Sequence, residues 1–165
     1  MDLGSTITAV VIVLICVLPF ILMSRKNRKR KQQFLDALSD LARKSNSKMS
    51  RHDSWNTAAI GVDEENGMIF FSRKTNGINS LQQVSLADVQ DCRLLNTGSD
   101  DGENYKVIDK LELAFNHHDR NKGETVFEFY AADAATSNLS GELELANNWL
   151  KIANDTIAAL PQRKK

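Results

Sequence analysis

An uncharged apolar run near the start of the sequence constrains this chain more than any other feature. The 21 residues from Leu3 to Met23 carry no charge, and in the last 17 of them only Thr8 and Pro19 are not plainly apolar. As a helix rising 1.5 Å per residue, the run would extend about 30 Å, the thickness of a bilayer's hydrocarbon core. A helix that packs on a soluble core carries a polar stripe, whereas this run is apolar all round. We therefore expect residues 1–24 to form a transmembrane helix.

Basic residues follow the apolar run directly and predict its orientation. They are Arg25, Lys26, Arg28, Lys29, Arg30 and Lys31. A cleaved signal peptide has its bases before the apolar region and small residues after it, whereas here only Asp2 precedes the run and no small-x-small pattern follows. Because Lys and Arg are retained on the cytoplasmic side, we expect the N-terminus outside and residues 25–165 in the cytoplasm. The chain is predicted to be a single-pass protein of the cytoplasmic (inner) membrane, with a cleaved signal as the alternative.

The same basic segment raises the question of its binding partner. A run of bases can bind nucleic acid, but directly after a membrane span it is expected to lie against anionic headgroups, each base contributing about 1 kcal/mol. The predicted partner is thus the lipid bilayer, with no nucleic acid. Residues 1–50 carry nine Lys or Arg against three Asp or Glu, while residues 51–165 carry twelve against eighteen. The acidic second part should be repelled by an anionic leaflet and turn toward a protein partner.

Residues 32–45, QQFLDALSDLARKS, have the spacing of an amphipathic helix. Its apolar face would consist of Phe34, Leu35, Leu38, Leu41 and Ala42. This face needs a partner, which can be the following domain, a second copy of the chain or the membrane surface. Residues 45–56 are rich in Ser and Asn and lack an apolar period, so we expect a linker there. Residues 25–54 would then join the membrane span to the folded domain as basic segment, helix and linker.

Beyond Trp55 the pattern changes to period-two alternation and short runs, which are typical of strands. The acidic turn DEENG separates NTAAIGV from MIFFSRK and indicates a hairpin, and the Asn-Gly turn in TNGIN predicts the next hairpin, to SLQQVSL. DVQDCRLLN, KLELAFN and TVFEFYA are predicted to be further strands, with the Gly- and Asp-rich segment TGSDDGEN forming an irregular loop. The sequence therefore predicts five to seven antiparallel strands.

A C-terminal helix is expected after the strands. One face of it would contain Leu139, Leu143, Ala146, Leu150, Ala153, Ile157 and Leu160. Trp149 and Ile152 would lie at the edges of that face, with Ser140 as the N-cap and Pro161 ending the helix before a basic tail, 162–165. Strands followed by a helix indicate an α+β domain spanning residues 55–161, either a sheet or a small barrel.

This order of elements, with a Trp in the helical segment ELELANNWLKIAND, resembles the pleckstrin-homology-like (PH-like) superfold. The resemblance implies a bent β-barrel plugged by its C-terminal helix, and a module that binds proteins or lipids. Members that hold inositol phosphates use bases around the first hairpin loop, but the three successive acids of DEENG would repel an anionic headgroup. The bases near this loop are Arg73 and Lys74, which we expect to be solvated.

The remaining polar residues predict no catalytic or metal-binding set. Adjacent His117 and His118 would point to opposite faces of a strand, and His52 is the only other histidine, so we expect an exposed hairpin turn instead of a zinc site. The segment DDGEN at 100–104 lacks the ligand spacing of a calcium loop. Cys92, in an apolar strand, is expected to be a buried structural thiol. No catalytic residue, metal or cofactor is predicted.

These observations predict a membrane-anchored, non-enzymatic binding or scaffold protein whose cytosolic PH-like domain recruits a protein partner, with self-association possible. Membrane-lipid recognition by the cytosolic domain is the alternative from a second class. A cryptic hydrolase, with residues brought together only by folding, is the third.

Overall fold

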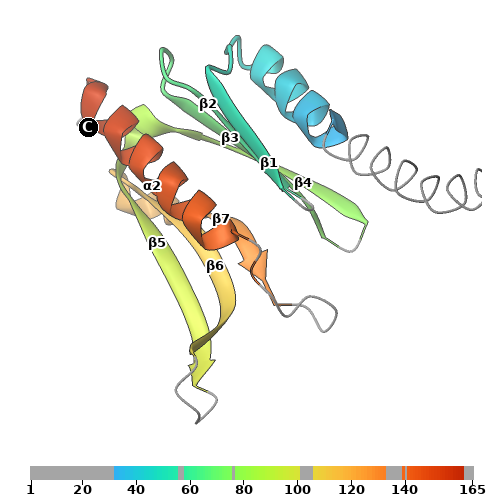
Figure 1. The fold of residues 1–165 in the computed structure, drawn as a ribbon. Helices are drawn as coiled ribbons and strands as arrows, with labels where there is room; N and C mark the ends of the chain where they lie inside the picture. The colour runs from blue at the N-terminus through green and yellow to red at the C-terminus, as the bar shows by residue number, and fades with distance from the viewer. Residues whose placement is uncertain are drawn as a thin grey trace, which may run out of the picture.

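The computed structural model describes part of the chain, and the elements below belong to that part. The described residues are 32–55, 58–75, 77–100, 106–132, 139 and 141–161. The predicted transmembrane helix and all six basic residues of segment 25–31 lie outside them. No helix within the described residues is long and apolar enough to cross a membrane. The described part is an α+β structure with two antiparallel sheets and a C-terminal helix (Figure 1).

The first sheet is a four-stranded meander. Its strands, in spatial order, are β1 (Arg51–Trp55), β2 (Ala58–Asp63), β3 (Met68–Thr75) and β4 (Ile78–Ser85). The hairpins predicted on either side of DEENG and of TNGIN are confirmed as β2–β3 and β3–β4. The linker prediction for 45–56 was wrong at its end, because residues 51–55 pair with β2 along their full length.

The amphipathic helix predicted at 32–45 is confirmed as a helix over residues 32–44. It covers one face of the four-stranded sheet (Figure 1), where Phe34 and Leu38 are buried against Ala59 of β2 and Phe70 of β3. Among the three partners considered for its apolar face, the helix therefore packs on its own domain.

The two central strands of this sheet are covered on both faces. Ile60 and Phe71 are buried in the main core, while Ala59 and Phe70, one position along each strand, are buried under helix 32–44. Because successive strand residues point to opposite faces, a strand covered on both sides is apolar at nearly every position. This explains the continuous apolar sequences AAIGV and MIFF.

The second sheet has three strands in spatial order β5 (Val89–Asp100), β6 (Lys106–His117) and β7 (Glu124–Ala131). A short 3₁₀ turn at Leu86–Asp88 precedes β5, and another at Arg120–Lys122 lies between β6 and β7. The prediction of an irregular loop from residue 97 was wrong in part. Thr97 still pairs with Lys110, and the ladder continues after a bulge to Asp100.

Helix α2 (Glu142–Ala159) completes the core between the two sheets. The predicted helical face was shifted: Trp149, expected at its edge, is fully buried, whereas Leu143 is 37% exposed. The N-cap is Gly141, with a left-handed backbone (φ 98°), and not Ser140. Trp149 thus stands at the centre of a core that includes both sheets.

Candidate binding surface

The two open sheets leave four edge strands: β1, β4, β5 and β7. An edge strand presents unpaired backbone N–H and C=O groups, to which an extended polypeptide can add as a further strand. The groups that cover each edge therefore indicate where the domain can receive a partner.

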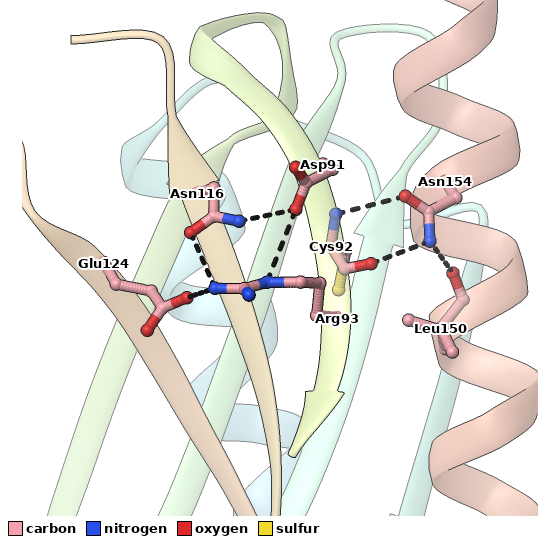
Figure 2. Close-up of polar contacts among 7 residues, drawn as sticks. All are labelled: Asp91, Cys92, Arg93, Asn116, Glu124, Leu150 and Asn154. Carbon is pink, nitrogen blue, oxygen red and sulfur yellow. Dashed lines mark hydrogen bonds and ion pairs between the residues drawn. The ribbon is translucent and has the colours of Figure 1, made fainter. Parts of the chain in front are cut away.

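The β5 edge is covered by α2 (Figure 2). The carboxamide of Asn154 accepts from the backbone N–H of Cys92 at 3.1 Å and donates to its carbonyl oxygen at 3.0 Å. The same Nδ2 donates to the carbonyl of Leu150, one turn earlier in α2, at 3.1 Å. Asn154 therefore takes the place that a neighbouring strand would occupy beside Cys92.

The β7 edge is covered by two side chains from the first sheet. Arg73 Nη1 donates to the carbonyl of Glu128 and also pairs with its carboxylate, both at 2.6 Å. Trp55 Nε1 donates to the carbonyl of Phe129 at 3.1 Å. The expectation that Arg73 is solvated was wrong, since its side chain is only 15% exposed and joins the two sheets.

The β1 edge runs beside α2. Trp149 Nε1 donates to Asp53 Oδ2 at 2.8 Å, and Arg51 pairs with Glu64 at 2.9 Å. A groove of about 210 Å³ lies there, lined by Arg51, Glu64, Ile152, Asp155, Thr156 and Ala159. This groove is small and carries both signs of charge, and α2 flanks β1 there through the bond from Trp149 to Asp53.

The β4 edge differs from the other three. Within the described part of the chain β4 pairs with β3 alone, and residues 78–81 are all exposed. Ile78 is 74% exposed and Leu81 is 47% exposed, and they are two of the three exposed large apolar side chains among the described residues. The β3–β4 hairpin projects from the end of the sheet (Figure 1).

The sequence of β4 lacks the usual protection of an edge. Natural edge strands are commonly blunted by Lys, by Pro or by inward-pointing charges. Residues 75–87 contain none of these and no charged residue at all. This uncharged, partly apolar edge is the candidate binding surface, and we call Ile78–Ser85 the β4 edge below.

The acidic turn DEENG is built differently from the sequence-based expectation. Asp63 is buried and accepts from the backbone N–H of Lys48 at 2.8 Å and of Asn66 at 3.0 Å, and from Asn66 Nδ2 at 2.7 Å. Burial alone would raise the pKa of Asp63, but these bonds, with one from Ser47, outweigh burial and lower it. Because Glu64 pairs with Arg51, the turn presents less free negative charge than three acids in a row suggest.

The histidine pair lies at the junction of β6 and the following turn. His117 is the last residue of β6 and is only partly exposed, with Nε2 at 2.8 Å from Thr125 Oγ1, so the exposed turn predicted for it was wrong. The backbone N–H of His118 donates to the carbonyl of Asp88 at 2.9 Å. Among the described residues no group of three or more His, Cys, Asp or Glu side chains could hold a metal ion.

Cys92 is buried, as predicted, with 5% of its surface exposed. Burial, and secondarily the charge of Asp91, raises the pKa of its thiol to about 12. A thiol is nucleophilic as the thiolate. At neutral pH Cys92 therefore serves the core of the domain and has little nucleophilic character.

Comparison with known proteins assigns no family to the chain. A scan against protein-family models found no match, and searches of curated proteins and of solved structures found no match either.

Proposed function

We propose that this chain is a single-pass membrane-anchored binding or scaffold protein without enzymatic activity, whose domain recruits a protein partner through the β4 edge. One observation carries the proposal: Asn154 caps the β5 edge at Cys92, Arg73 with Trp55 caps the β7 edge, and α2 flanks the β1 edge through Asp53, whereas the β4 edge is exposed and uncharged. Backbone hydrogen bonds would supply affinity, and Leu81 and Ile78 would add apolar contacts.

We also propose that the domain is PH-like. The support is the order of elements, a four-stranded meander, a three-stranded meander and then a helix whose Trp149 is buried between the sheets. Many domains of this superfold act by binding, and the fold by itself specifies no ligand.

The membrane placement belongs to the same proposal. It rests on the uncharged run Leu3–Met23 and on the bases that follow it, which favour a cytoplasmic location for the domain. A reporter enzyme fused after Lys165 should be active in the cytoplasm. Activity on the opposite side of the membrane would contradict this placement.

Recognition of a lipid surface is a second candidate, and one observation favours it. The β3–β4 hairpin carries both the exposed apolar Ile78 and the exposed base Lys74, residue types suited to a membrane interface. Flotation of full-length protein cannot separate this from the anchor, so the test must identify what the hairpin touches.

A photoreactive amino acid introduced at Asn79 of the full-length chain makes that identification in native membranes. His52, exposed on β1, is the matched control position. We expect protein adducts at Asn79 and few at His52, and we expect Leu81→Lys to remove the Asn79 adducts by placing a charge on the edge. Adducts to lipid alone would favour the second candidate. Equal protein adducts at the two positions would contradict recruitment through β4.

A further inference from the structure

We infer that the occupant of the β4 edge is the β4 edge of a second copy of this chain, so that two four-stranded sheets join into one antiparallel sheet. This inference rests on the proposed function, because it requires that the β4 edge bind a strand. It goes beyond that function by naming the partner and the alignment of the two strands.

Charge is the first argument for a second copy. In a two-fold symmetric strand pair, a residue on the axis meets its own copy, so a charged residue there would face an identical charge. A partner of different sequence could accommodate charges on β4 by supplying opposite ones. The absence of any charged residue from 75 to 87 suits self-pairing in particular.

The alternation of side chains limits the possible alignments. Directly opposite residues of antiparallel strands lie on the same face of the sheet. Leu81 pairs with Ser72 and shares the face covered by helix 32–44, whereas Gln82 pairs with Phe71 and shares the inner face. Leu81 of one copy therefore cannot lie opposite Gln82 of the other. The same holds for any two neighbouring residues, so the two-fold axis must pass between one residue and its own copy.

Leu81 is the exposed apolar residue at the middle of β4, so an axis there pairs the strand along nearly its full length. It is 47% exposed in the single chain and would be covered by its own copy. An axis at Leu81 also sets Ile78 opposite Val84, Asn79 opposite Gln83 and Ser80 opposite Gln82. The exposed Ile78 then meets an apolar residue, and the polar side chains face polar ones.

The anchor is compatible with this arrangement. Because a two-fold strand pair keeps each face of the sheet on its own side, helices 32–44 of both copies would lie on one face of the joined sheet. The first described residue of the helix, Gln32, would then lie on that same face in both copies. This placement is compatible with two copies held in one bilayer by the proposed anchor.

Helix 32–44 offers no comparable apolar surface for contact with a second copy. Its buried side chains Phe34, Leu38 and Ala42 are already covered within one chain. The apolar surface left for a second copy in the described residues is at β4, together with Leu143 at the start of α2.

Disulfide trapping in native membranes tests the inference with the full-length chain. Each variant carries Cys16→Ser, so that the remaining native thiol is the buried Cys92. We expect Leu81→Cys to form a disulfide-linked dimer several-fold more readily than the control His52→Cys, whose side chain is exposed on β1. Because paired Cβ atoms across antiparallel strands lie about 5 Å apart, an axis at Leu81 is within disulfide reach.

A second pair of variants tests the alignment. Ser80→Cys and Gln82→Cys, co-expressed on distinguishable copies, should link to each other more readily than either links to itself. With the axis at Leu81, Ser80 of one copy would lie about 7 Å along the strand from Ser80 of the other, and the same holds for Gln82.

Equal linking of Leu81→Cys and His52→Cys would indicate random collision and overturn the inference. Linking of Leu81→Cys only to a different protein would contradict pairing with a second copy but would leave recruitment through β4 intact. If Leu81→Cys linked to no protein, both claims would be contradicted.

Discussion

The carboxamide of Asn154 hydrogen-bonds to both backbone groups of Cys92, and by this pair of bonds α2 replaces a missing strand at the β5 edge. This pair of hydrogen bonds has two structural roles. The bonds fix α2 against the three-stranded sheet, and they deny the β5 edge to any added strand at that position. The domain thus closes one edge by a single side chain while its β4 edge stays exposed.

Asn154→Ala should therefore destabilise the fold. The variant leaves a backbone donor and an acceptor of Cys92 without their partner, and a loss of about 2 kcal/mol in the free energy of unfolding is expected. Urea unfolding of the full-length protein in detergent measures this loss. Asn147→Ala is the matched control, because Asn147 lies on the same helix, is exposed and donates only to the carbonyl of Leu143 at 2.9 Å. Similar losses for the two variants would contradict the role given to Asn154.

Asp63 predicts a specific dependence of stability on pH. Its pKa is lowered in the folded state from an ordinary value of 3.8, so its contribution is present above that value and is lost as pH falls through the lower, folded pKa. Stability of the wild type should include a loss in this acid range that Asp63→Asn does not show. Thermal unfolding at a series of pH values from 6 downward checks it, and identical pH profiles for both proteins would refute it.

Cys92 should react with thiol reagents only when the domain opens. With a pKa of about 12, on the order of 10⁻⁴ of the thiol is ionised at pH 8, and the side chain is buried. In a Cys16→Ser background, alkylation by iodoacetamide should be slow in buffer and rapid in denaturing urea. Asn154→Ala should accelerate it, since the variant loosens the strand that carries Cys92. Rapid labelling of the native wild type would show that the strand is open.

The local elements of this fold could be predicted from sequence because their signals are local. The DEENG and Asn-Gly turns between short apolar runs predict the β2–β3 and β3–β4 hairpins, and the 3.6-residue period predicts helix 32–44 and α2. β1 was missed because RHDSW is polar at its beginning and lies on an edge. Its strand conformation depends on pairing with β2, which local sequence does not encode.

Features that depend on distant contacts could not be predicted. Arg73 looked solvated because its partner, Glu128, lies 55 residues away in the sequence. Trp149 was placed at the edge of α2 because its central position depends on two sheets meeting around it. The β4 edge did have a sequence signal, the uncharged stretch 75–87, but this becomes meaningful only once β4 is known to be an edge strand.

Hydrogen exchange along β4 in the membrane-embedded full-length protein tests the central claim most directly. If the β4 edge is paired, backbone amides within 78–85 should exchange slowly in the wild type and several-fold faster in Leu81→Lys, while those of β1, residues 51–55, exchange alike in both. Equal and fast exchange of the outward-facing β4 amides in the wild type and in Leu81→Lys would contradict the claim that this edge is the binding surface.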